Sequence, residues 1–498
     1  MLVPFCLLAM ASCGVANDDM AGDTSATSVE TTTTVAVVPI DPIQWDACDD
    51  QPADSDIRCA ELVVPYSYED PSIGSFTLHV KKRPADDPTK RVGSMFVNPG
   101  GPGFGGSSLA PDANYYFSSS LLEVFDVIAW DPRGTGLSTP AIDCVDDYDQ
   151  YFALDSPPET EDERVALIDA TLDFNARCSE RSGDILQWVS TRASAQDMDS
   201  LRRALGEDTI TYFGFSYGSE LGGTWATMFP DTVRAAVFDG ASDPNEPPLQ
   251  QSLNQAAGFE QQLSAFLADC SATATCEFHN NGDAEGAFDR LLVGIDRSPL
   301  VVSPDRAAVT QGVTFTAVAQ AMYADFLWPE LERALASAQR GDGSGLLKLY
   351  DDYYQRKNDG TYGNELEAFL AITCLDNRDL SSIDEVEATV DQFVEIAPRL
   401  GANFAYGYAC ALWPVPVDSG VTVTAAGAGT IVVVGTTGDA ATPLDSTRRL
   451  AAALGDGRLI VVEANQHTGY GANECIVDAV DRYLISREIP KEGLVCTD

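Results

Sequence analysis

Ser216 is the residue whose neighbours most clearly indicate chemistry, because residues 214–218 read Gly-Phe-Ser-Tyr-Gly. The β-branched and aromatic residues at 209–213 predict a short buried strand before it, and residues 220–229 predict a helix after it. A serine between two glycines at such a strand-to-helix turn stands on a sharp, strained bend that exposes its hydroxyl. The pattern therefore predicts a nucleophile for acyl transfer from a carbonyl carbon.

A nucleophilic serine needs a base that takes its proton and a carboxylate that orients the base. In the strand–turn–helix arrangement, the acid and then the histidine follow the serine along the chain. Of the three histidines, His79 lies in an expected hairpin and His279 in a helical region. His467 alone follows a late strand, at 459–463, so we expect it to be the base.

The acid should follow the preceding strand, because parallel α/β sheets carry their sites at the carboxyl ends of the strands. Asp439 lies in a Gly- and Thr-rich turn directly after the expected strand at 431–434. Asp445 is the alternative, but it falls in the first turn of the next expected helix, where a carboxylate suits the helix dipole. The sequence therefore predicts a triad of Ser216, Asp439 and His467.

The oxyanion of the tetrahedral intermediate needs two backbone N–H donors. The first expected donor is Tyr217, which directly follows the serine. The second should come from the loop 100–103, which reads Gly-Gly-Pro-Gly, with Gly101 as the expected donor. Glycine allows the backbone to approach a ligand closely, and proline stiffens the loop.

The same loop raises an alternative, because residues 101–106 match the dinucleotide fingerprint G-x-G-x-x-G, with Asp126 and Asp131 near the expected later acid. The match does not follow the first expected strand, and the oxyanion role accounts for it together with Ser216. Cys-x-x-Cys pairs are absent and histidine is scarce, which argues against a zinc site. We therefore expect neither a cofactor nor a metal.

The elements that must position these residues alternate between strands and helices, which indicates a mostly parallel sheet. From 244 to 419 helical patterns dominate, and strand patterns return only near 429. We therefore predict an α/β-hydrolase fold with a helical cap, 244–423, inserted between the core segments 41–243 and 424–498. The expected strands are the hairpin at 58–83 and segments 92–97, 122–130, 209–213, 233–238, 429–434 and 458–463; the expected helices include 190–205, 249–268, 315–339 and 383–396.

The charge of the chain excludes some partners. Its 498 residues include 76 Asp and Glu against 30 Lys and Arg, a net charge of −46. Nucleic acids need a basic footprint, so we expect no nucleic-acid partner, and an anionic membrane surface is repelled as well. The charge suits solubility outside the cell, and steering of cationic or free-amine substrates is a possible additional effect.

The first residues are typical of export. Residues 2–11 are apolar but too short to span a bilayer, and small residues precede Cys13, as in a bacterial lipoprotein signal. We therefore expect a signal segment at 1–13 with lipidation at Cys13, and an extracellular or cell-surface location. A plain secretory signal is the alternative. The Thr- and Ser-rich stretch 14–40 is expected to be a disordered linker.

The chain has 12 cysteines, of which Cys6 and Cys13 lie in the expected signal segment. The other ten fall into neighbouring pairs, which in an exported chain predicts five disulfides. Each closes a loop of the unfolded chain and should stabilise the fold by about 2–4 kcal/mol. The expected pairs are Cys48–Cys59, Cys144–Cys178, Cys270–Cys276, Cys374–Cys410 and Cys475–Cys496.

Eight motifs occur in order along the chain. They are NPGGPG at 98–103, DPRGTG at 131–136, GFSYG at 214–218, DGASDP at 239–244, CLD at 374–376, CALWP at 410–414, GDAATP at 438–443 and His467. Together they resemble a known family, the secreted tripeptidyl aminopeptidases of actinobacteria in the prolyl aminopeptidase group of α/β-hydrolases. The resemblance covers about residues 48–496 and implies the roles given above for the triad and for Gly101 and Tyr217. Ser219 and Glu220 stand where the family usually has Thr-Tyr, and Gln466 where it usually has glycine; these departures leave the triad intact and concern substrate choice.

The resemblance implies release of short peptides, with tripeptides expected, from polypeptide substrates with free N-termini. Such an enzyme must bind the substrate's ammonium group through carboxylates. The candidates are Asp376, which we favour, and Glu220, Glu365 and Glu367. The alternatives are a serine esterase or other acyl hydrolase with the same triad, and a non-enzymatic surface protein with a vestigial site.

Overall fold

A computed structural model describes residues 40–497, so the expected signal segment with Cys13 and nearly all of the expected linker lie outside the described residues. The chain forms one ten-stranded sheet in the order β1-β2-β3-β5-β4-β6-β7-β8-β9-β10. The pairings from β5 to β10 are parallel, and those among β1, β2, β3 and β5 are antiparallel. This confirms the mostly parallel sheet and the opening hairpin. The strands are β1 (Asp46–Ala47), β2 (Arg58–Pro65), β3 (Ser75–Arg83), β4 (Gly93–Asn98), β5 (Phe125–Trp130), β6 (Ile210–Phe215), β7 (Val233–Asp239), β8 (Ile431–Thr436), β9 (Gly457–Val462) and β10 (Leu494–Cys496).

Helices cover both faces of the sheet, which explains why its central strands are apolar throughout rather than alternating. In β8, Ile431 and Val433 pack into the cluster that also contains side chains of α5, α6 and α17. Val432 and Val434 pack on the opposite side with side chains of α2 and α18. These helices are α1 (Ala113–Tyr116), α2 (Ser119–Val124), α5 (Thr191–Leu205), α6 (Tyr217–Met228), α17 (Leu444–Ala453) and α18 (Glu474–Ser486).

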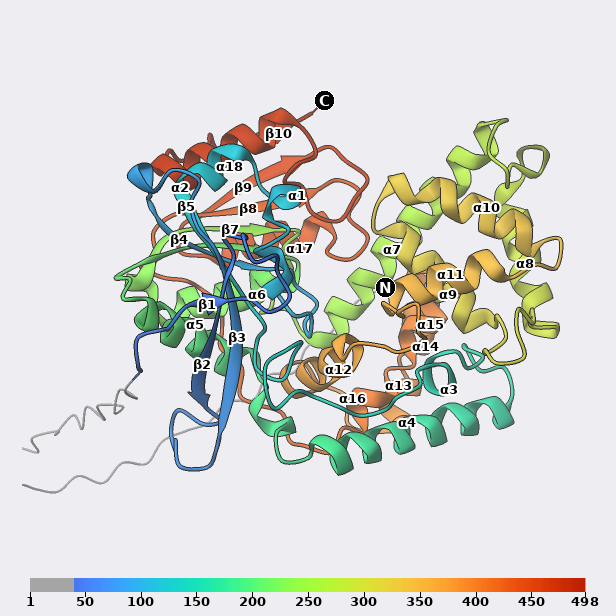
Figure 1. Cartoon of the computed structure of the whole chain (residues 1–498). Coiled ribbons are helices and arrows are strands. Elements are labelled where there is room, and N and C mark those ends of the chain that lie inside the picture. The colour runs from blue at the N-terminus through green and yellow to red at the C-terminus, as the bar shows by residue number, and fades with distance from the viewer. Residues whose placement is uncertain (1–39, 498) are drawn as a thin grey trace, which may run out of the picture. The chain divides into compact units, whose positions relative to one another are not determined.

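A helical region is inserted between β7 and β8, as the sequence predicts. It has a hydrophobic core of its own, which includes Leu263, Phe288 and Leu335. Figure 1 shows α7 to α11 gathered to the right of the sheet. The inserted helices are α7 (Pro248–Ala272), α8 (Ala284–Arg297), α9 (Gln311–Met322), α10 (Trp328–Ala338), α11 (Ser344–Tyr353), α12 (Glu365–Asp376), α13 (Ile383–Glu387), α14 (Val390–Ile396), α15 (Gly401–Ala405) and α16 (Tyr408–Ala411).

A second helical segment, which the sequence reading did not separate from the core, leaves the sheet between β5 and β6. It contains α3 (Asp149–Phe152) and the long helix α4 (Glu161–Ser182), which begins with a capping box at Thr160. The Asn175 side chain donates to the Ala409 carbonyl, and Arg164 forms an ion pair with Glu387 of α13. The segment therefore packs against the inserted helices.

Three expected elements have different limits in the structure. The strand expected from 122 begins at Phe125, because Ser118 caps a short helix by accepting the Leu121 N–H. The helix expected at 315–339 is broken between α9 and α10, and Pro329 in the first turn of α10 favours a new helix start there. The helix expected at 383–396 is likewise divided into α13 and α14.

Residues 40–497 contain five disulfides, in the neighbouring pairs that sequence order suggests: Cys48–Cys59, Cys144–Cys178, Cys270–Cys276, Cys374–Cys410 and Cys475–Cys496. Such a number is consistent with export to an oxidising compartment. Among the described residues, no helix combines the length and apolarity needed to cross a membrane.

Candidate active site

Ser216 lies at the tight turn between β6 and α6. Its backbone has φ 54° and ψ −124°, a strained conformation for a residue other than glycine. Its N–H donates to the Asp239 carbonyl (2.8 Å), and the Ser219 N–H and hydroxyl both donate to its carbonyl oxygen (2.8 and 2.6 Å). A β-carbon added at Gly214 would lie 2.3 Å from the Gly218 carbonyl oxygen, so the turn requires glycine there.

Asp439 and His467 are in direct contact. Asp439 follows β8, is 4% exposed, and accepts the backbone N–H groups of Ala441 (3.0 Å) and Thr442 (2.8 Å). The His467 Nδ1 atom lies 2.9 Å from both carboxylate oxygens of Asp439. Burial lowers the pKa of His467, but the negative charges of Asp439 and Asp239 more than offset this and leave that pKa raised. The carboxylate therefore stabilises the imidazolium.

Thr442 contacts both Asp439 and His467. Its hydroxyl donates to the Asp439 carboxylate at 2.9 Å and lies 3.2 Å from His467 Nδ1. Sequence reasoning missed this residue, although its position three residues after Asp439 in the same turn was a usable signal. The hydroxyl fixes the carboxylate relative to the imidazole ring.

Two further elements hold the loop that carries His467. From the core, the buried Asp239 carboxylate at the end of β7 accepts the N–H groups of Gly469 (2.6 Å) and Tyr470 (2.8 Å). Burial raises the pKa of Asp239 to about 6. From the inserted helices, the Tyr323 carbonyl accepts the His467 N–H at 2.7 Å, and the two rings meet edge to face. Nothing in the sequence indicated Tyr323.

Ser216 stands between two cavities. One, of about 410 Å³, is lined by Ser216, His467 and Glu365. The other, of about 280 Å³, is lined by Ser216 and Glu220. No hydrogen bond joins the Ser216 hydroxyl to the imidazole here, which is common when no substrate is bound. The two cavities adjoin, because Gly101, Tyr323, Tyr353 and Phe369 also line both.

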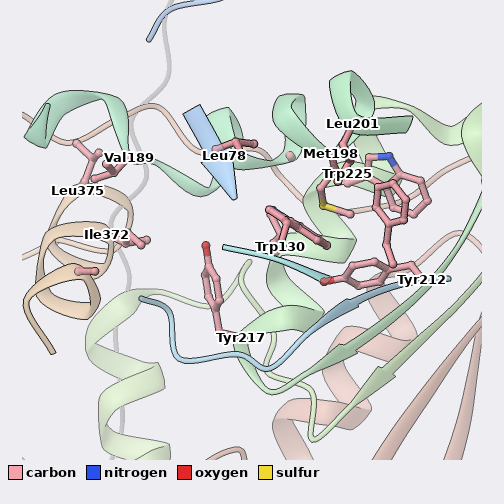
Figure 2. Close-up of a cluster of buried hydrophobic side chains, with 14 of the residues drawn as sticks. Leu78, Trp130, Val189, Met198, Leu201, Tyr212, Tyr217, Trp225, Ile372 and Leu375 are labelled. Carbon is pink, nitrogen blue, oxygen red and sulfur yellow. The ribbon is translucent and has the colours of Figure 1, made fainter. Parts of the chain in front are cut away.

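The two expected oxyanion donors lie beside Ser216. Tyr217 is the first residue of α6, so its N–H has no partner within the helix. Gly101 lines both cavities, and the preceding Gly100 packs so closely that an added β-carbon would lie 2.9 Å from the Ser216 β-carbon. The Tyr217 side chain is buried in the hydrophobic cluster of Figure 2, near Ile372 of α12.

The dinucleotide interpretation does not fit this loop. The fingerprint needs a helix that starts at the glycines, but no helix starts there: the first element after β4 is the three-residue turn Ser107–Leu109, and the short helices α1 and α2 begin only at Ala113 and Ser119. Asp131 is also occupied, because its carboxylate accepts the N–H groups of Ser107 (2.7 Å) and Leu137 (2.8 Å).

Of the four candidate carboxylates, two are held by hydrogen bonds inside the protein and two line the cavities beside Ser216. Asp376, which we had favoured, is half-buried and accepts both the N–H (2.9 Å) and the hydroxyl (2.6 Å) of Thr191. Glu367 is buried and accepts the N–H groups of Cys144 (3.0 Å) and Val145 (2.8 Å). Both therefore have internal partners.

The other two candidates line the cavities beside Ser216. Glu365 borders the larger one and Glu220 the smaller one. Burial raises the pKa of Glu220 to about 7. The rejected acid Asp445 lies in the first turn of α17 in an exposed ion pair with Arg448, which agrees with the helix-dipole interpretation.

Two family models match the chain. Residues 397–496 match the model described as TAP-like protein, and residues 94–281 match the one described as alpha/beta hydrolase fold. The first includes Asp439 and His467, and the second includes Ser216.

Curated relatives match along nearly the whole length. The chain is 34% identical over 477 residues to the serine protease Hip1 of Mycobacterium tuberculosis, covering 91% of both chains. It is 35% identical over 472 residues to carboxylesterase B of the same species, covering 91% of this chain and 89% of the relative. It is 28% identical over 474 residues to the tripeptidyl aminopeptidase of Streptomyces lividans, covering 91% of this chain and 86% of the relative.

Proposed function

Because this chain belongs to the TAP-like family of α/β-hydrolases and is a serine hydrolase, we propose that it is an exported aminopeptidase that releases short peptides, with tripeptides expected, from free N-termini. The observation that carries the proposal is the contact of Asp439 with His467, whose ring lines a cavity that Ser216 also lines. The family resemblance and the peptidases among the relatives favour peptide substrates over other acyl compounds.

In the proposed reaction, the Ser216 hydroxyl attacks the scissile carbonyl carbon while His467 Nε2 takes its proton. Asp439 holds the Nδ1–H and stabilises the imidazolium. The backbone N–H groups of Gly101 and Tyr217 bind the oxyanion. His467 then donates the proton to the leaving amine, and the acyl group stays on Ser216. Water, deprotonated by His467, releases the short peptide and restores the serine.

Recognition of a free N-terminus requires an acidic group near the serine. Glu220 and Glu365 are the better candidates, because each lines a cavity that Ser216 also lines. Asp376 and Glu367 are set aside for this role, since backbone and side-chain donors already occupy them. We further propose a lipid anchor at Cys13 at the cell surface, a residue outside the described part of the chain.

A serine esterase is the second candidate function. It is favoured by the 35% identity to carboxylesterase B and because the same triad can hydrolyse esters as well as amides. The non-enzymatic alternative is set aside, because the chain is a serine hydrolase.

The Ser216→Ala variant tests the proposed nucleophile. We expect kcat on any peptide or ester substrate to fall by about 10³-fold or more, because the covalent step is lost. Ser486→Ala is the matched control, since that exposed hydroxyl only bonds the Arg482 carbonyl on α18. Undiminished turnover in a folded Ser216→Ala protein would overturn the assignment.

A further inference from the structure

Glu220 occupies a particular position relative to the proposed nucleophile. It lies on α6 four residues after Ser216, and both residues line the cavity of about 280 Å³. Four residues of helix rise by about 6 Å in all. When an acyl group is bound to Ser216, two of its parts can therefore come close to the Glu220 carboxylate. These are the side chain of the residue that carries the carbonyl and a group one residue away from that carbonyl.

The cavity contains no cation that could neutralise Glu220. Among the described residues that line it there is no Lys, Arg or His. The other carboxylate on its wall, Glu246, is already paired with Arg449 at 2.8 Å and bonded by Asn254. Glu220 is bonded instead by the neutral amide of Asn377.

A second carboxyl group, that of Asp376, lies close to Glu220 and adds to the negative potential there. Asp376 lies near enough to raise the pKa of Glu220 further, and it is held in place by Thr191, whose hydroxyl also bonds the Tyr217 hydroxyl at 2.5 Å. Burial raises the pKa of Asp376 as well, to about 7. A positive charge brought into the cavity would stabilise the ionised form of both groups.

We propose that this cavity binds a primary ammonium group of the substrate's acyl part, and that Glu220 is the residue that selects for it. The ammonium belongs either to a lysine side chain at the residue that carries the scissile carbonyl or to the free α-amine of a short acyl group. The inference rests on Ser216 as the nucleophile, but not on the cleaved bond being a peptide bond. Glu365 lines the adjoining cavity and not this one, so the preference tested here is assigned to Glu220 alone.

Three esters with one leaving group test the proposal. They are the 4-nitrophenyl esters of Nα-acetyl-lysine, with a side-chain ammonium only; of norleucine, with an α-ammonium only; and of Nα-acetyl-norleucine, with neither. We expect kcat/KM for at least one ammonium ester to exceed that for the uncharged ester by about tenfold or more. The preferred ester identifies the source of the ammonium. Equal rates for all three would overturn the proposal.

The Glu220→Gln variant assigns the preference to this side chain, because it removes the charge at nearly constant shape. The ratio of ammonium to uncharged ester should fall about tenfold. Glu332→Gln is the matched control, a carboxyl with a pKa also raised by burial that lines a different cavity. There the ratio should stay unchanged. A preference that survives in Glu220→Gln would overturn the proposal.

Inhibition of the unmodified protein provides a second test that does not depend on whether the variant folds. Nα-acetyl-lysine or norleucine should inhibit hydrolysis of the uncharged ester competitively, with a Ki at least about tenfold below that of Nα-acetyl-norleucine. Equal inhibition by all three would contradict the proposal. If peptides resist cleavage while the esters react, the peptidase function fails but the ester ratio still decides this inference.

Discussion

Thr442 illustrates how a neutral side chain can determine the geometry of a charged pair. Its hydroxyl donates to one Asp439 oxygen, and the backbone N–H groups of Ala441 and Thr442 occupy the other. The carboxylate is therefore held by three donors from its own turn before His467 makes its contact. These three hydrogen bonds fix the orientation of the Asp439 carboxylate.

The Thr442→Val variant keeps the shape of the side chain but removes the donor. A hydrogen bond to a charged group contributes about 1.5–3 kcal/mol, so we expect kcat to fall by about 10- to 100-fold. KM should change less, because the change acts on the triad. Steady-state kinetics compared with Thr171→Val, whose hydroxyl only bonds the Leu167 carbonyl on α4, would check this. An unchanged kcat would show that Thr442 does not position the pair.

Whether a residue of the candidate site could be predicted from the sequence depends on how far away in the sequence its contact partners lie. Ser216, Asp439 and His467 could be predicted, because each follows a strand in a recognisable local pattern. Asp376 was favoured for a binding role, but it bonds Thr191, a contact with a separation of 185 residues that no local pattern reveals. Tyr323 was missed for the same reason.

At the scale of elements, the oxyanion loop and α12 are packed without space between them. A β-carbon added at Gly103 would lie 2.4 Å from the Phe369 nitrogen and 2.6 Å from the Glu365 carbonyl oxygen. Gly103 also has a φ of +91°, which strains any other residue. The inserted helix α12 therefore packs directly against the loop that contains the proposed oxyanion donor Gly101.

We expect Gly103→Ala to displace this loop. The strain and the backbone collision should lower the free energy of unfolding by about 2–4 kcal/mol and reduce kcat/KM more than tenfold. Thermal unfolding and kinetics would measure both effects. Gly407→Ala serves as the control, because its β-carbon would meet nothing within 4 Å and its φ is −71°. Full activity in Gly103→Ala would contradict the expected contact.

The elements themselves were predictable where burial imposes a simple pattern. The strands from β6 to β8 consist mostly of buried apolar residues, and this distinguishes them from their surroundings. Breaks within helical regions were harder, because apolar residues continue across the break between α9 and α10. The packing of α4 on the insertion depends on tertiary contacts such as Asn175 with Ala409.

For the whole molecule, buried acids make stability depend on pH. The pKa of Glu220, Asp376 and Glu367 is raised to about 7, in each case mainly by burial. Between about pH 4 and 7 the folded chain therefore binds more protons than the unfolded chain, so the free energy of unfolding falls as the pH rises. The raised pKa of His467 acts in the same direction, because its stabilising charge is lost above that pKa.

We therefore expect the midpoint of thermal unfolding to be lower at pH 8 than at pH 5.5, by roughly 2 °C or more. Self-repulsion within a chain of net charge −46 adds to this trend. Differential scanning calorimetry at constant ionic strength would measure it. Glu220→Gln should show a smaller difference between the two pH values. A midpoint that rises towards pH 8 would contradict the assignment of these groups.

The most direct test of the proposed function compares a tripeptide 4-nitroanilide that has a free N-terminus with its N-acetylated twin and with 4-nitrophenyl acetate. We predict cleavage of the free tripeptide, with release of the intact tripeptide, and little or no cleavage of the acetylated one. Equal cleavage of both peptides would contradict an aminopeptidase. Ester turnover with both peptides intact would leave a serine esterase instead.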